Sequence, residues 1–202
     1  MKRIMRYQIV AAAVLGALSA SGCGEYARQG RSPAQLVVVS LLSAAATSSA
    51  VPTTFSSGPL NSDVPDVSAG QTVFDDFGQV TMRLVMRDPG EGTPAAPTPI
   101  NEVTITSYRV EYRRTDGRNT PGVDVPLAFT GAITMTVPAS GTAASAFELV
   151  RHVAKVEPPL AVLGRSPVVL TVIAEVTFFG RDQAGNAVSA SGSVQINFAN
   201  FA

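Results

Sequence analysis

The sequence has little of the chemistry that most enzymes and metal sites need. Its 202 residues include one cysteine, one histidine and no tryptophan. A single cysteine excludes an intramolecular disulfide, a CxxC redox motif, a haem-attachment pair and a multi-cysteine zinc site. No P-loop, GxGxxG or GxSxG segment occurs. Any Ser-His-Asp or Cys-His catalytic system would have to use His152, the one histidine. The simpler interpretation is that His152 has a structural role or lies at the edge of the domain, in contact with solvent.

Charged residues are also few, at 15% of the chain, and their signs balance. Lys2, Arg3 and Arg6 belong to the first 22 residues, which contain no acid. The remainder therefore has 12 basic and 15 acidic side chains, a net charge of −3. Binding to nucleic acid depends on a dense basic face that displaces counterions. The sequence gives no case for a nucleic-acid partner, and its 46% hydrophobic content is typical of a globular chain.

The longest uninterrupted apolar stretch near the N-terminus is too short to cross a bilayer. Residues 9–18 are isoleucine, valine, alanine and leucine with one glycine, and they follow the three basic residues above. A membrane core of ~30 Å takes about 20 apolar residues to span. A positive segment, a short apolar segment and the small residues 19–22, in that order, are typical of a cleavable signal peptide.

The segment Ala20-Ser21-Gly22-Cys23 resembles the lipobox of bacterial lipoproteins. The resemblance implies that residues 1–22 are removed, that the Cys23 thiol receives a diacylglyceryl group and that the new amino terminus is acylated. Lipid then anchors the chain to a membrane, and residues 23–34 form a tether. Gly24, in place of the aspartate that retains such proteins in the inner membrane, implies the outer membrane of a diderm cell envelope. The alternatives are an ordinary signal peptide before a chance cysteine, or a buried N-terminal strand.

Residues 35–202 are predicted to form one β-rich domain. Alternating apolar and polar residues predict half-buried strands at 79–87, 103–113 and 188–198. Further strands are expected at 36–42, 127–137 and 168–179, the last apolar on both faces as in a central strand. The apolar phase reverses between Ile105 and Tyr108, which predicts a β-bulge near Thr106 or Ser107.

In two segments the apolar residues follow no clear helical or strand periodicity. Residues 43–70 are rich in alanine, serine, threonine, proline and glycine, and we expect an irregular segment with short strands around Val51 and Leu60. Residues 146–156 fit helical spacing and a strand equally well. Pro158 and Pro159 end that element in either case.

Two short segments resemble immunoglobulin-like modules of bacterial surface proteins. The sequence of residues 105–113, ITSYRVEYR, is similar to the third strand of fibronectin type III domains. The sequence of residues 182–186, DQAGN, is similar to the final hairpin of several bacterial immunoglobulin-like domains. The resemblance implies an all-β fold, a single immunoglobulin-like β-sandwich of about seven strands. Such modules mostly bind proteins or glycans or act as spacers, and the fold alone does not decide which.

Acidic residues in loops are the candidate metal ligands. Calcium takes six to eight oxygen ligands, and the aspartates that could supply them are Asp63, Asp66, Asp75, Asp76 and Asp182. No ordered ligand series is present, so aspartates that bind their own turn backbone are the simpler interpretation, and we expect no cofactor. Phe74 and Phe77 flank the aspartate pair and form either an exposed binding patch or a buried edge of the domain.

These observations favour a non-enzymatic envelope lipoprotein whose β domain contacts another envelope component. Its expected partners are the membrane, through the lipid, and an envelope protein or glycan. Exposed strand edges and the loops at 43–70 and 88–99 are the candidate contact surfaces. A carbohydrate- or small-ligand-binding module is the second hypothesis, which requires exposed aromatic residues on a concave face. An envelope hydrolase that uses His152 is the third.

Overall fold

The computed structural model describes residues 31–88 and 96–201. The predicted signal peptide at 1–22 and Cys23 lie outside these residues. The compact β unit begins at Ser32, three residues before the boundary expected from the sequence. Ser32 is buried, and its carbonyl accepts a hydrogen bond from Nε of Arg87 at 3.1 Å. Among the helices of the described ranges, none combines the length and the apolar character that a membrane span requires.

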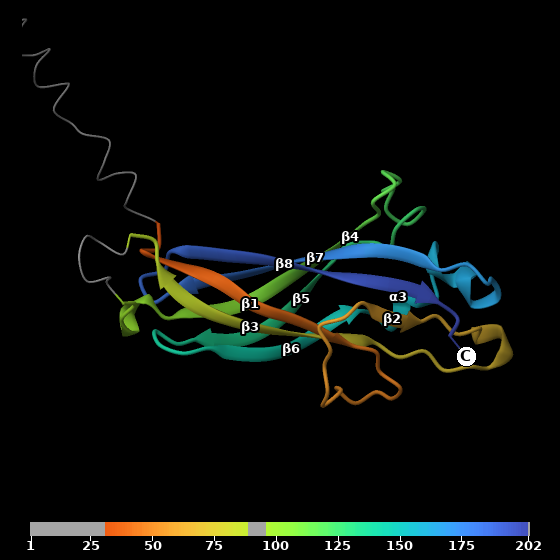
Figure 1. The fold of residues 1–202 in the computed structure, drawn as a ribbon, viewed down its shortest axis with the longest axis horizontal. Coiled ribbons are helices and arrows are strands. Elements are labelled where there is room, and N and C mark those ends of the chain that lie inside the picture. The colour runs from red at the N-terminus through yellow and green to blue at the C-terminus, as the bar shows by residue number, and fades with distance from the viewer. Residues whose placement is uncertain (1–30, 89–95, 202) are drawn as a thin grey trace, which may run out of the picture. The chain divides into compact units, whose positions relative to one another are not determined.

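Eight strands in two sheets make up the described part of the chain (Figure 1). The antiparallel three-stranded sheet has the order β1-β3-β6, with bounds β1 Ala34–Ala44, β3 Asp76–Met86 and β6 Ala143–Val150. The five-stranded sheet has the order β2-β8-β7-β4-β5, with bounds β2 Leu60–Asp63, β8 Ala187–Ala199, β7 Leu170–Asp182, β4 Val103–Arg113 and β5 Phe129–Val137. The short helical elements are η1 Val67–Ala69, η2 Pro99–Asn101, α3 His152–Lys155 and η3 Leu160–Arg165. The predicted all-β class is confirmed, with eight strands where about seven were expected.

One buried cluster contains side chains from both sheets, which lie in two layers in Figure 1. Its aromatic centre joins the layers: the ring of Phe147 on β6 meets Tyr108 on β4 at 5.0 Å and Phe178 on β7 at 5.2 Å, both edge to face. Such pairs add about 0.5–1.5 kcal/mol each beyond the area they bury. Three smaller aromatic rings thus occupy the centre of the core in a chain that has no tryptophan. The immunoglobulin-like assignment stays a prediction.

The predicted bulge in β4 is present. The register of β4 shifts between Ile105 and Ser107 against both of its neighbours, β5 and β7. Because of this shift, Ile105 and Tyr108 both point into the core although they are three residues apart, and Thr106 is left on the outer face. Gly180 of β7 lies opposite the bulge, where a Cβ atom would meet the carbonyl oxygen of Thr104. Glycine therefore lets the two backbones approach.

The irregular segment at 43–70 differs in part from its prediction. The strand expected around Leu60 is β2, but the one expected around Val51 is wrong: Val51 is exposed and lies outside any strand. An isolated bridge between Ser43 and Ser56 closes this loop instead. Strand β2 pairs in parallel with β8, from Leu60 opposite Ile196 onward, in a sheet whose other pairs are antiparallel.

Other elements differ from the prediction mainly at their ends. Neither alternative for 146–156 holds alone, because β6 ends at Val150 and one helical turn, α3, follows. The strand expected from 168 begins at Leu170, with Val168 and Val169 exposed before it. That strand, β7, is central in the sheet, but only alternate side chains are fully buried, so its second face is less covered than its composition predicts.

Candidate functional site

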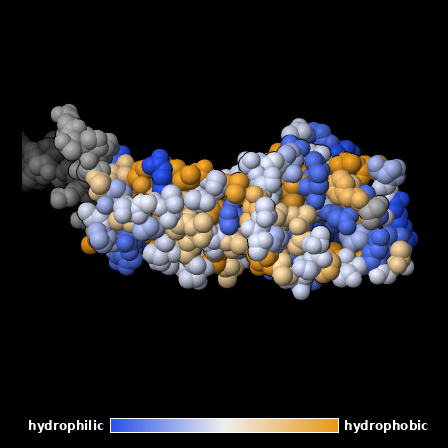
Figure 2. All heavy atoms as spheres, turned by 60° about the horizontal axis from the view of Figure 1, so that its bottom comes forward, coloured by the Kyte–Doolittle hydropathy of each residue, from blue (hydrophilic) through white to orange (hydrophobic). Residues whose placement is uncertain are grey.

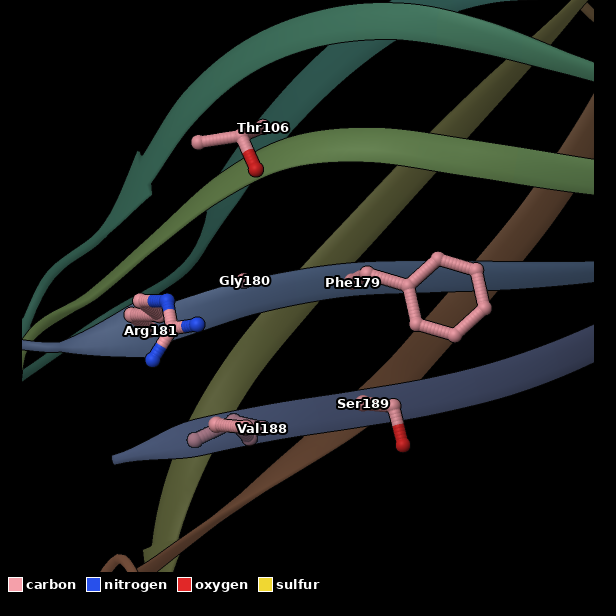
Figure 3. Close-up of a pocket in the computed structure, with 7 residues that line it drawn as sticks. Thr106, Phe179, Gly180, Arg181, Val188 and Ser189 are labelled. Carbon is pink, nitrogen blue, oxygen red and sulfur yellow. The ribbon is translucent and has the colours of Figure 1, made fainter. Parts of the chain in front are cut away.

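A shallow hollow lies on the outer face of the five-stranded sheet, beside the bulge of β4 (Figure 3). Phe179 and Arg181 project outward from β7 on either side of Gly180, with Thr106 on one neighbouring strand and Ser189 on the other. The hollow has a volume of ≈ 330 Å³, and Phe179 is 39% exposed. It therefore combines an accessible aromatic ring with one guanidinium group and two hydroxyls.

The rest of this outer face is polar, and the charges on it largely balance. Hydroxyl and amide groups bond across the strands between Thr104 and Thr136 (3.3 Å), Thr177 and Ser191 (2.9 Å), Thr171 and Asn197 (3.0 Å), and Asn197 and Asn61 (3.1 Å). Its charged side chains include two ion pairs, Arg109 with Glu111 at 2.9 Å and Arg113 with Glu175 at 3.0 Å. Exposed pairs of this kind contribute little stability. Because these charges are paired, the face consists of hydrogen-bonding groups with little net charge.

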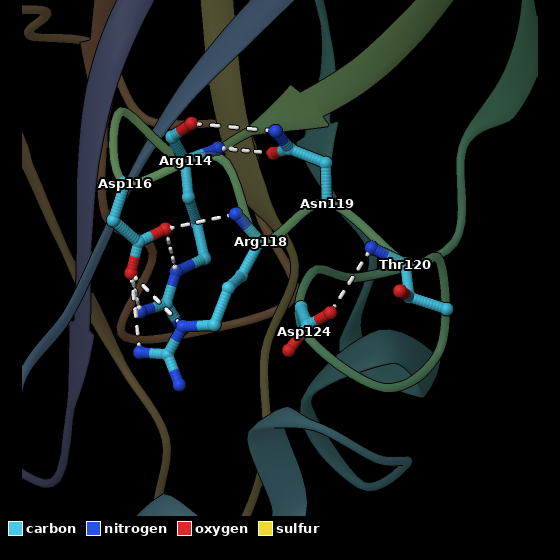
Figure 4. Close-up of polar contacts among 6 residues, drawn as sticks. All are labelled: Arg114, Asp116, Arg118, Asn119, Thr120 and Asp124. Atoms are coloured by element: carbon cyan, nitrogen blue, oxygen red, sulfur yellow. Dashed lines mark hydrogen bonds and ion pairs between the residues drawn. The ribbon is translucent and has the colours of Figure 1, made fainter.

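The loop after β4 is held in one conformation by its own polar groups (Figure 4). The carboxylate of Asp116 accepts hydrogen bonds from the guanidinium groups of Arg114 and Arg118. The bond from Arg114 is the main reason that the pKa of Asp116 lies well below its ordinary value. Asn119 Oδ1 accepts from the backbone N–H of Arg114 at 2.6 Å, and Asp124 Oδ2 accepts from that of Thr120 at 3.2 Å.

This ordered loop borders a second hollow, of ≈ 300 Å³, on the outer face of β4. Arg109 and Arg113 of β4 line it on one side and Pro121 and Pro126 of the loop on the other. The loop, the hollow and the sheet face together form one surface whose polar groups are bonded to one another. Groups already held by internal hydrogen bonds lose less entropy when a partner binds.

A buried polar network lies below the surface, between the start of β3 and α3. The carboxylate of Asp76 is fully buried, and its Oδ2 lies 2.9 Å from Nζ of Lys155, whose side chain is 2% exposed. The Ser62 hydroxyl donates to the same oxygen at 2.6 Å, and the backbone N–H of Ala46 donates to Oδ1 at 3.2 Å. Burial raises the pKa of Asp76, and the charge of Lys155 only partly offsets that effect.

The neighbouring carboxylate, Asp75, is partly buried and binds His152. Its Oδ1 accepts the backbone N–H of His152 at 2.6 Å and contacts Nδ1 of the same residue at 2.8 Å. His152 is the first residue of α3 and is more than half exposed. Asp75 orients the imidazole ring of His152 through Nδ1, in the same way that the aspartate of a catalytic triad orients its histidine. No described contact brings a nucleophilic side chain to that ring.

Of the five aspartates that could bind calcium, Asp75 and Asp76 have the partners given above. The other three lie at the ends of separate elements: Asp63 ends β2, Asp66 precedes η1 and Asp182 ends β7. Asp63 accepts the backbone N–H of Phe201 at 3.0 Å. Asp66 caps η1 and forms an ion pair with Arg165 at 3.1 Å. Asp182 binds the backbone and side chain of Asn186 across the β7–β8 turn. In the described ranges there is no group of three or more histidine, cysteine or acidic residues placed to hold a metal ion.

The remaining candidates from the sequence, Phe74 and Phe77, do not lie in a site with the other candidate residues. Phe74 and Phe77 are half-buried, and Phe77 lines a hollow between β5 and β6 together with Tyr108 and Phe147. Two features escaped the sequence analysis: the hollow at Phe179 and the network at Lys155. The first depends on strand register. The second has a signal in the composition, since lysine occurs only at positions 2 and 155.

Comparison with known proteins identifies no relative: no family model, no curated protein and no solved structure matches the chain.

Proposed function

We propose that this chain is a non-enzymatic lipoprotein of the bacterial cell envelope, anchored by lipid on Cys23, whose β domain binds or supports another envelope component. The observation that carries the proposal is the outer face of the five-stranded sheet with the ordered loop of residues 114–126 at its margin. Both are polar and accessible, and hydrogen bonds connect the side chains within each of them. Interfaces of soluble modules use such preformed surfaces for recognition.

The distribution of reactive groups also supports a binding role over a catalytic one. Asp76 and Lys155 are enclosed, while Asp63, Asp66 and Asp182 are engaged in turns. On the face that Figure 2 presents, apolar residues occur in small groups among polar ones. A surface of this kind fits a partner that is held by hydrogen bonds around a few apolar contacts.

The proposed anchor restricts where the domain can act. From Cys23 to the start of the packed unit at Ser32 the chain spans at most ~32 Å when extended. The domain would therefore work close to the bilayer surface. Cys23→Ala is expected to move the protein from the membrane fraction to the soluble fraction, and an unchanged distribution would contradict lipidation.

Crosslinking in intact cells, followed by mass spectrometry of the captured partners, tests the binding role. Ser193→Arg places a bulky charge on the outer face of β8 and should reduce recovery of the partner severalfold. Gln35→Arg is the matched control, because it makes the same type of change on an exposed position of β1 in the other sheet. Equal loss in both variants, or recovery of the protein alone, would count against the proposal.

A carbohydrate-binding role is the second candidate, and the hollow at Phe179 favours it. Sugar rings stack on exposed aromatic rings, and their hydroxyls bond to side chains such as Arg181, Thr106 and Ser189. Titration with cellohexaose and with chitohexaose, followed by calorimetry, should show heat that Phe179→Ala abolishes. No heat with either sugar would remove this candidate.

A further inference from the structure

Lys155 is an exception among the basic residues of the chain. The sequence contains two lysines, and the other, Lys2, belongs to the predicted leader. At all other basic positions of the described ranges the side chain is arginine or His152. Arginine is the usual choice for a buried ion pair, since its guanidinium binds a carboxylate in two places and is more weakly hydrated. An amine, unlike a guanidinium, becomes a good nucleophile once it loses its proton.

The surroundings of Lys155 bring an amine, a carboxyl group and two hydrogen-bond donors together. Its Nζ is 2.9 Å from Oδ2 of Asp76, and both side chains are almost completely closed to water. The N–H of Ala46 points at Oδ1, and the hydroxyl of Ser62 is bound to Oδ2. These four residues come from four separate segments, namely β3, α3, β2 and the loop after β1.

We propose that the side chains of Lys155 and Asp76 condense inside the folded domain to form an amide bond, which crosslinks the start of β3 to α3. This inference is independent of the proposed function, because it concerns the interior of the domain and no partner.

The reaction needs only groups of this chain. In the ion pair, Nζ first passes one proton to Oδ2, which gives a neutral amine and a neutral acid. Burial favours this exchange because it penalises separated charges. The nitrogen lone pair then attacks Cγ, and the developing negative charge on Oδ1 is stabilised by the N–H of Ala46.

The second half of the reaction releases water. The nitrogen loses another proton, which the hydroxyl of Ser62 can relay to Oδ2, and the bond between Cγ and Oδ2 breaks. The products are one amide and one water molecule, and nothing is oxidised or reduced. Fixing the two reactants in contact can be equivalent to an effective concentration of about 10⁵ M or more. Condensation also replaces two buried charges with one neutral group.

Peptide mapping of the full chain, purified and denatured, tests the crosslink directly. Trypsin should release residues 32–83, which contain Asp76, from either form of the chain. The peptide that contains Lys155 is residues 152–155 in an unlinked chain and residues 152–165 in a linked one. If the amide has formed, trypsin does not cut after Lys155. The two peptides then leave joined, with a mass lower than their sum by one water molecule. Lys155 should also resist an amine-reactive label in denaturant.

Neighbouring aspartates provide a matched pair of variants. Asp76→Ala should abolish the joined peptide, whereas Asp75→Ala removes the adjacent carboxylate, which binds His152, and should leave the joined peptide intact. Ser62→Ala should lower the joined fraction in newly made protein severalfold. Complete cleavage after Lys155 in the unmodified chain would overturn the proposal, and this result requires no variant to fold. A joined peptide that survives Asp76→Ala would overturn it equally.

Discussion

Gly78 of β3 lies directly under the ring of Phe147 on the neighbouring strand β6, at a place where the two residues are register partners. A Cβ atom added at Gly78 would overlap the ring, and the ring cannot retreat without disturbing its edge-to-face contacts with Tyr108 and Phe178. A glycine in a strand interior ordinarily weakens the sheet. Here it makes room for the aromatic centre of the core.

Gly78→Ala is therefore expected to destabilise the domain by about 1–3 kcal/mol through overpacking. The free energy of unfolding in urea measures the effect. Gly58→Ala is the control, because its added Cβ would meet only the Ser56 hydroxyl at an ordinary contact distance of 3.6 Å. A Gly78 variant as stable as the Gly58 variant would show that Phe147 can move.

The buried hydroxyl of Tyr112 donates to the carbonyl of Leu149 at 2.7 Å and so links β4 to β6 across the core. Burial raises the pKa of this phenol far above its ordinary value, so it donates at any pH at which the protein is folded. Tyr112→Phe leaves the Leu149 carbonyl without that donor and should cost about 1–3 kcal/mol of unfolding free energy. Thr177→Ala, which removes an exposed cross-strand hydroxyl pair, should cost much less. Equal losses would contradict this assignment.

Acid should weaken the attachment of η1 to η3. The hydroxyl of Ser68 and the guanidinium of Arg165 hold the pKa of Asp66 below its ordinary value. A carboxyl whose pKa is lower in the folded chain stabilises the fold above pH ~4, and this contribution disappears as pH falls through the folded pKa. Asp66→Asn should therefore lower Tm at pH 7 but not at pH 2. A Tm difference that stays constant between these pH values would refute the linkage.

The sequence predicts those parts of the fold that depend on local alternation. The bulge was predictable because Ile105 and Tyr108 are both apolar but are three residues apart. In a regular strand their side chains would point to opposite faces, so an irregularity is needed to bring both into the same core. The β7–β8 hairpin was predictable for the same reason, since its apolar residues alternate along β8 up to the turn at Asp182–Asn186.

Features that depend on distant partners were not predictable. Nothing in Leu60–Asp63 indicates a parallel pairing with β8, more than 130 residues later. The apolar residues of 146–156 belong to two elements, because Val150 ends a strand and Lys155 turns inward to meet Asp76. The hollow at Phe179 exists only through the shift in β4 that leaves Thr106 on the outer face.

The parallel pairing of β2 sets an order for events during synthesis of the chain. Strand β2 bonds to residues 196–199 of β8, and the next backbone N–H, of Val64, donates to the carbonyl of Ala199. The ribosome makes residues 196–199 more than 130 residues after residues 60–63. Strand β2 therefore stays without this partner until the end of β8 has been made. An affinity tag fused directly behind Phe201 would disturb the junction of β2 and β8, whereas an insertion at Gly141, in the exposed turn before β6, would avoid it.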